Sequence, residues 1–198
     1  MVAQLTHEAV CEASGGDGAM RCLWYSAIGA CLARRAFRRD YYVQAGDLLL
    51  RHDPDDPELQ FMMLGSLRQG PSTGEFHSWV AAPLDSRRFE VVDLSSRAYP
   101  QLVEGALAVR AQSVAGDQVA TLVKPSELRW RRPAPPPYLW LTVEGGRWPL
   151  DWVMLRMDPW CCDKVQKPAA DLLIEHRHTV KKYFDRLEEA LRLGREYA

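Results

Sequence analysis

The order of its segments is the feature of this sequence that most constrains the fold. Apolar periodicity predicts two helices at the start of the chain and a long amphipathic helix at the end. Between them lies a run of strand-like segments, the first four of which have no helical pattern between them. The expected helices cover 2–13, 20–38 and 168–195, and the main strands 41–50, 59–67, 75–82 and 88–94. Helices that are segregated from consecutive strands predict an α+β fold with an antiparallel sheet.

The chain of 198 residues has the length of a single domain. We expect the helix at 20–38 to be buried against the sheet, since its first half is apolar nearly all round. Further strands are expected at 138–143 and 151–157, and the segment 101–123 is expected to hold a helix and a strand. Turn-forming residues predict loops at 52–57 and 69–74, and the proline-rich segment 131–137 predicts an extended connector.

Charge and hydropathy exclude several classes of function. The 25 basic and 26 acidic residues leave a net charge of −1, which argues against a nucleic-acid partner. The apolar runs fall far short of the roughly 20 residues that span a bilayer, so we expect no membrane partner. Residues 1–19 lack the basic start of a signal peptide. No glycine-rich nucleotide-binding motif is present either.

The five cysteines are Cys11, Cys22, Cys31, Cys161 and Cys162. Their odd number and the lack of a CxxC pair predict reduced thiols in a cytoplasmic protein. The adjacent Cys161 and Cys162 have no further ligand nearby at a zinc-binding spacing, so neither a metal site nor a cofactor is expected. Each thiol therefore serves either packing or chemistry.

Cys22 has the position best suited to chemistry. It follows a flexible break at 14–18, where three of five residues are glycine, and it lies in the first turn of the buried helix. The unpaired N–H groups and the dipole at a helix start stabilise a thiolate and can hold an oxyanion. Small residues follow at helical spacing and would let a neighbouring element approach closely: Ser26, Gly29, Ala30 and Ala33.

The two strands 75–82 and 88–94 suggest a partner for that thiol. A turn centred on Asp85 would place His77 opposite Asp93 on one face of a hairpin. The same register pairs Trp79 with Val91, and Ala81 with Phe89. A carboxylate beside the imidazole would orient the ring and leave its other nitrogen to act as a base. The pattern predicts a Cys22, His77 and Asp93 triad.

These motifs resemble the papain/transglutaminase-like cysteine hydrolase superfamily. The resemblance rests on the segments 21–27, 76–80 and 91–94, whose sequences are RCLWYSA, FHSWV and VVDL. The His-x-Trp piece and the stretch from Asp93 to Pro100 also resemble a small, uncharacterised bacterial branch of it. The likeness covers residues 15–100, the half that would hold the chemistry, while 101–198 would complete the sheet and add the C-terminal helix.

The resemblance implies a cysteine peptidase or amidase, or a transglutaminase-like acyltransferase, acting on an amide, peptide or isopeptide bond. Cys22 would be the nucleophile, His77 the base and Asp93 the orienting group, with a peptide or protein-derived amide as substrate. The stretch 15–21 just before Cys22 contains no Gln, so the second oxyanion donor is not assigned. The oligomeric state is not assigned either. A buried thiol and a packed histidine would also fit a non-catalytic binding or scaffold protein on the same fold, which is the alternative hypothesis.

Overall fold

The structure is a computed structural model that describes residues 1–16, 18, 21–51, 60–64, 76–101, 104, 134–144, 147–149 and 153–196. It has the α+β fold that the order of segments predicts. The α-helices with described bounds are α1 (Val2–Ser14), α2 (Cys22–Phe37), α4 (Pro159–Glu175) and α5 (Arg177–Glu196), and a short 3-10 helix, η2, covers Ser96–Ala98. The strands are β1 (Tyr42–Arg51), β2 (Gln60–Leu64), β3 (His77–Pro83), β4 (Arg88–Asp93), β5 (Leu139–Glu144), β6 (Arg147–Pro149) and β7 (Val153–Met157).

All strand pairs of the described sheet are antiparallel, in the order β5-β4-β3-β1-β7-β6. β1 is its centre, because one edge of this strand pairs with β7 and the other edge is shared by β3 and β2. A bulge between Leu48 and Leu49 lies where β2 pairs. The expected strands at 41–50, 59–67, 75–82, 88–94, 138–143 and 151–157 are confirmed where they fall within the described residues, whereas the short β6 was not expected.

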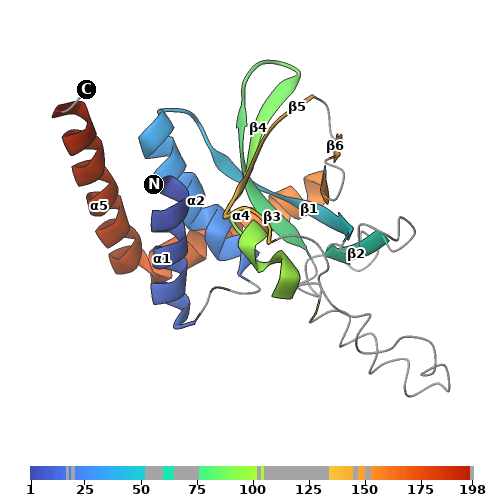
Figure 1. Ribbon diagram of the computed structural model, residues 1–198, viewed down its shortest axis with the longest axis horizontal. Helices are drawn as coiled ribbons and strands as arrows, with labels where there is room; N and C mark the ends of the chain where they lie inside the picture. Colours follow the sequence, from blue (N-terminus) through green and yellow to red (C-terminus); the bar gives the residue numbers. More distant parts are fainter. Residues whose placement is uncertain are drawn as a thin grey trace.

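The helices α1, α2, α4 and α5 form layers on one side of this sheet (Figure 1). α2 packs on β3 and β1, and α4 packs beside it on β1. α1 and α5 lie side by side over α2, as Figure 1 also shows. The sheet and three helices therefore bury the middle of α2, from Tyr25 to Ala30, together with Leu32 and Ala33, which agrees with the burial expected for this helix.

One glycine explains how closely α2 approaches the strands. A Cβ atom at Gly29 would lie 2.2 Å from the Leu94 side chain and 3.5 Å from those of Thr6 and Val80. Only hydrogen fits between α1, α2 and the β3–β4 pair at this point. The small residues at helical spacing thus have the packing function that the sequence predicts.

The C-terminal helix differs from its prediction. The single helix expected at 168–195 is two helices that meet at His176. α4 begins earlier, because the side chain of Asp158 accepts a hydrogen bond from the N–H of Trp160 and Pro159 occupies the first helical position. The two helices pack against different neighbours, α4 against β1 and α5 against α1, so the chain must change direction between them.

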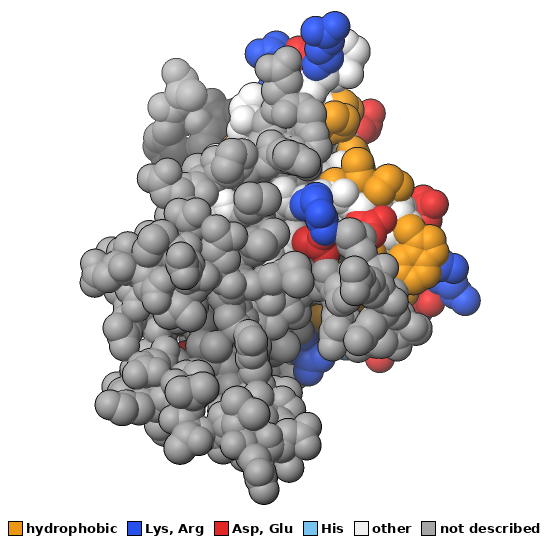
Figure 2. All heavy atoms as spheres, turned by 90° about the vertical axis from the view of Figure 1, so that its right-hand side faces the viewer, with side chains coloured by type: hydrophobic (Ala, Val, Ile, Leu, Met, Phe, Trp, Pro, Cys, Tyr) orange, Lys and Arg blue, Asp and Glu red, His pale blue; other side chains and the backbone are white. Residues whose placement is uncertain are grey.

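The two faces of the sheet carry separate clusters of apolar side chains. The helix-facing cluster includes Val43, Ala45, Val80, Ala82 and Val92, together with residues of all four helices. The cluster on the opposite face includes Leu48, Leu50, Trp79, Val91, Tyr99 and Leu155. Basic and acidic side chains are interspersed with hydrophobic ones over the described part of the face shown in Figure 2. None of the described helices is both long enough and apolar enough to cross a membrane.

Some sequence predictions concern residues outside the described part of the chain. The loops at 52–57 and 69–74 and nearly all of the helix and strand expected at 101–123 belong to this group. Within the connector expected at 131–137, the described residues 134–137 have no helix or strand.

Candidate active site

Cys22 is the first residue of α2, as the sequence predicts. No side chain among the described residues caps this helix start, and the first backbone hydrogen bond of the turn runs from the N–H of Tyr25 to the carbonyl of Arg21. Cys22 as a whole residue is partly exposed, whereas its thiol lies in a buried environment. The Sγ atom donates to the carbonyl of Phe76 at 3.6 Å. The thiol therefore lies where β3 begins, next to the N-terminus of a buried helix.

His77 is the first residue of β3 and is fully buried. Its Nε2 lies 2.5 Å from Oδ2 of Asp93, the last residue of β4, which is also fully buried. The hairpin thus brings together the histidine and the carboxylate that the sequence pairs. The other ring nitrogen, Nδ1, is buried and has no hydrogen-bond partner among the described residues.

The register of that hairpin differs from its prediction. Val80 pairs with Val92 and Ala81 with Val91, which shifts β4 by two residues from the expected alignment. The cause is the turn, where Oδ1 of Asp85 accepts hydrogen bonds from the N–H groups of Arg87 and Arg88. Asp85 therefore begins the turn rather than occupying its centre. Because side chains alternate with a period of two, the shift leaves His77 and Asp93 on one face, as diagonal neighbours.

Asp93 is surrounded by hydrogen-bond donors. Its Oδ1 accepts from the N–H of Ser95 at 2.8 Å and from the Ser95 hydroxyl at 2.7 Å. Its Oδ2 accepts from the Tyr99 hydroxyl at 2.5 Å in addition to its contact with His77. Burial alone would raise the pKa of Asp93, but the charge of His77 and these hydrogen bonds outweigh it and lower the pKa. The group is therefore an ionised carboxylate.

The charges of the site are coupled from Asp93 through His77 to Cys22. Burial lowers the pKa of His77, but the Asp93 carboxylate more than compensates, and with Cys22 it raises the pKa to about 10. Burial raises the pKa of the Cys22 thiol, but the adjacent His77 ring and donation from Ser78 bring it below its ordinary value. These opposite shifts favour a thiolate and an imidazolium side by side.

Two buried serines lie next to the thiol. The Ser26 hydroxyl, one turn along α2, donates to Oγ of Ser78 at 3.0 Å. Ser78 in turn stabilises the charged form of Cys22 through its side chain and its backbone. Sequence reasoning placed Ser26 only in a packing stripe and gave Ser78 no role. Their two polar side chains facing each other between α2 and β3 are visible only in the folded chain.

The rings around His77 restrict its orientation. Trp79 lies two residues along β3, with its ring centroid 6.0 Å from that of His77. Its Nε1 donates to Oε1 of Gln44 on β1 at 3.0 Å. Tyr99 meets the imidazole edge to face, also at 6.0 Å between centroids. The histidine is thus held by neighbouring aromatic rings as well as by Asp93.

The other cysteines have a different electrostatic environment. Burial raises the pKa of Cys31, Cys161 and Cys162, and for Cys161 it does so, with help from the nearby Asp158, to about 11. Cys162 exchanges hydrogen bonds with the backbone of Ala45 at 3.3 Å. The described residues contain no group of three or more His, Cys, Asp or Glu side chains that could hold a metal ion.

Comparisons with known proteins assign no family to this sequence. No protein-family model matches the sequence, and no curated protein matches it either. A solved crystal structure of an uncharacterised genomics target is similar at 12% sequence identity and a TM-score of 0.45. That likeness covers 94% of this chain and 75% of the other. The proposals below therefore rest on the site alone.

Proposed function

We propose that this protein is a thiol-dependent hydrolase or acyltransferase that acts on an amide, peptide or isopeptide bond. The observation that carries the proposal is the buried His77–Asp93 pair next to a thiol of lowered pKa. Within the described part of the chain, Nδ1 of His77 has no hydrogen-bond partner. Nucleophile, base and orienting carboxylate are the three parts of an activated-nucleophile mechanism.

The reaction would start from the thiolate and the imidazolium. The Cys22 sulfur attacks the carbonyl carbon, and the oxygen of the tetrahedral intermediate takes up the negative charge. The N–H groups at the start of α2 would stabilise that charge. His77 then gives its Nδ1 proton to the leaving amine, the C–N bond breaks, and a thioester to Cys22 remains.

The second half of the reaction would return the enzyme to its starting state. His77, now neutral at Nδ1, takes a proton from water or from an acceptor amine as that group attacks the thioester. The C–S bond breaks and Cys22 leaves as a thiolate. Water would make the protein a hydrolase, and an amine would make it an acyltransferase. A reducing compartment such as the cytoplasm would keep this thiol competent.

The direct test is formation and turnover of an acyl-enzyme. A p-nitrophenyl ester acylates reactive thiols, so we expect a burst of nitrophenol and an acyl group on Cys22 by mass spectrometry, followed by slow turnover. His77→Ala should abolish the burst, and Cys31→Ser is the matched control that should leave it intact. Absence of acylation at Cys22 in the folded wild-type protein would contradict the proposal and favour a non-catalytic binding protein.

A further inference from the structure

The ionised carboxylate of Asp93 can only accept hydrogen bonds, and the polar groups that contact it donate them. Four hydrogen bonds reach the carboxylate: two from Ser95 to Oδ1, and one each from Tyr99 and His77 to Oδ2. All four groups are buried, so water does not replace any of these partners. An ionised carboxylate has room for about four donors and holds no proton of its own. The hydrogen on the His77–Asp93 bond must therefore belong to Nε2.

Tyr99 competes with His77 for one oxygen. Both the phenol oxygen and Nε2 lie 2.5 Å from Oδ2. Burial and the neighbouring Asp93 charge raise the pKa of Tyr99 well above its ordinary value, so the hydroxyl remains a neutral donor. Ser95, in contrast, serves only Oδ1. Among the described partners of Asp93, Tyr99 is thus the one that shares the oxygen used by the histidine.

We propose that Tyr99 is a positioning residue, which acts through Asp93 to hold His77 with its proton on Nε2 and its Nδ1 directed to the thiol. This role deepens the proposed function and rests on it. By taking part of the charge of Oδ2, the hydroxyl also limits how strongly Asp93 holds the imidazolium. His77 can then give up its Nδ1 proton when the leaving amine requires it.

The proposal predicts the effect of removing one oxygen atom. Tyr99→Phe keeps the ring against His77 but leaves Oδ2 to the histidine alone. The Nε2–H bond then strengthens, so its proton resonance should move downfield. The titration midpoint of His77 should rise by about 0.5 pH unit or more, a roughly threefold change in the proton equilibrium.

The measurement is NMR of ¹⁵N-histidine-labelled full-length protein, which reports the ring nitrogens of His77 in the absence of any substrate. Tyr41→Phe is the matched control, because Tyr41 is equally buried and its hydroxyl also donates to a carboxylate, that of Glu90. The control should leave both signals of His77 unchanged. If Tyr99→Phe folds and also leaves them unchanged, Tyr99 serves only packing and the proposal fails.

A second variant covers the case in which Tyr99→Phe does not fold. Site-specific 3-fluorotyrosine at position 99 keeps the hydroxyl and makes it a stronger donor, so the His77 midpoint should fall instead of rise. No shift, or a rise, would overturn the proposal. The outcome is separate from that of the proposed function: His77 can respond to position 99 even if Cys22 never forms an acyl-enzyme.

Discussion

Individual residues give the site its chemistry through opposed effects on their pKa values. Burial acts against the charged forms of Cys22, His77 and Asp93, yet each of them has a pKa shifted towards its charged form. The charged forms are stabilised because the three groups lie next to one another and because Ser78, Ser95 and Tyr99 add hydrogen-bond donors. Removing any charge should therefore leave the others buried without compensation.

Asp93→Asn tests this dependence through reactivity. Without the carboxylate, burial should return the pKa of His77 to its ordinary value or below, and the thiol loses its cationic neighbour. We expect Cys22 to react with iodoacetamide at least about tenfold more slowly near neutral pH. Competitive labelling read by mass spectrometry checks this, with Cys31 as the internal reference. Equal rates in wild type and variant would contradict the coupling.

The same variant makes a prediction about stability and pH. Loss of one partner of a buried ion pair costs about 3–5 kcal/mol of unfolding free energy. Since the folded-state pKa of His77 is raised to about 10, its contribution is fully present below the ordinary histidine pKa of about 6.5 and is lost as pH rises through 10. Urea unfolding should show the widest gap between wild type and Asp93→Asn at about pH 6, and a gap that does not narrow towards pH 10 would contradict the shift.

The sequence allowed the faces of these residues to be predicted, but not their full surroundings. Because side chains alternate between the two faces of a strand, the sequence predicts that His77 and Asp93 share a face. This prediction holds even though the predicted strand register differs from the observed one by two residues. The register itself depends on the side chain of Asp85 in the turn, which periodicity does not reveal. Ser78 carries no local signal, because its partner Ser26 comes from α2. Tyr99 lies only six residues after Asp93, but alternation does not predict their contact, because the 3-10 helix Ser96–Ala98 lies between them.

Among the elements, α2 sets the geometry of the site because it carries Cys22 and packs closely on β3. Its approach depends on Gly29, where a methyl group would meet Leu94. Helix propensity alone predicts that Gly→Ala stabilises by about 1 kcal/mol. At Gly29 overpacking should win, and we expect a loss of about 1–3 kcal/mol.

Gly194 in α5 provides the matched comparison, since no atom of the described residues lies within 4 Å of a Cβ atom built there. Gly194→Ala should stabilise the protein by up to about 1 kcal/mol. Thermal or urea unfolding of both variants measures the two effects. A stabilising Gly29→Ala would show that α2 does not approach the strands as closely as described.

The ends of the elements illustrate the limits of periodicity. The amphipathic pattern after 168 continues through His176, so it predicts one helix where the structure has two. The break follows from tertiary packing, because α4 lies on β1 and α5 on α1. The start of α4 had a local signal, Asp158 followed by Pro159, that could have located it.

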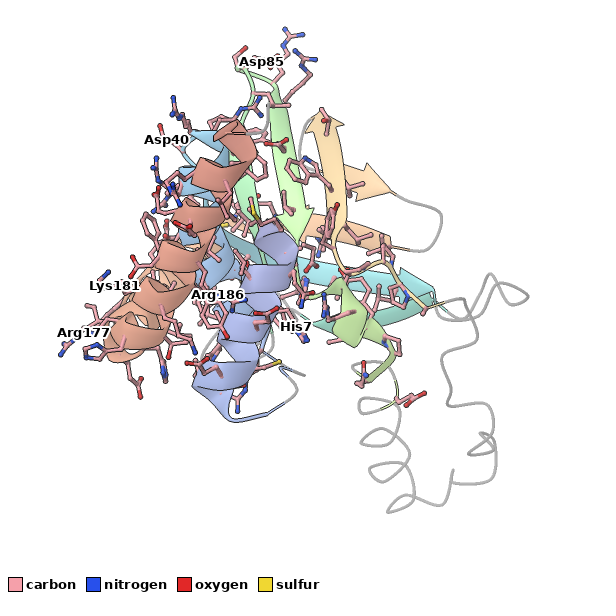
Figure 3. All side chains as sticks on the ribbon, turned by 60° about the vertical axis from the view of Figure 1, so that its left-hand side comes forward. His7, Asp40, Asp85, Arg177, Lys181 and Arg186 are labelled. Atoms are coloured by element: carbon pink, nitrogen blue, oxygen red, sulfur yellow. The ribbon has the colours of Figure 1, made fainter. Side chains whose placement is uncertain are left out.

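At the scale of the whole molecule, α5 packs against α1 and α2 and helps to hold them in place. Figure 3 shows Arg186 on the side of α5 that faces α1, and it pairs there with Glu8 at 2.6 Å, while Arg177 and Lys181 point away. A second ion pair joins Lys182 to Glu12. These contacts lie at the surface, whereas Leu187 on the same helix is fully buried in the helix-facing core.

The buried side chains of α5 should contribute more to the free energy of unfolding than its surface ion pairs. Leu187→Ala should cost about 2–5 kcal/mol of unfolding free energy through the cavity it creates. Glu12→Gln removes a surface ion pair and should have a far smaller effect. Urea unfolding of the two variants compares them directly. A larger effect from Glu12→Gln would mean that charge, not packing, holds α5 in place.

The account depends most on the pairing of the Cys22 thiolate with the His77 imidazolium. The pH profile of iodoacetamide labelling at Cys22, in wild type and in His77→Ala, tests it most directly. We predict a wild-type midpoint below the roughly 8.5 of an unperturbed thiol, and a higher midpoint in the variant. A Cys22 that labels no faster than Cys31, with a midpoint that His77→Ala leaves unchanged, would contradict the account.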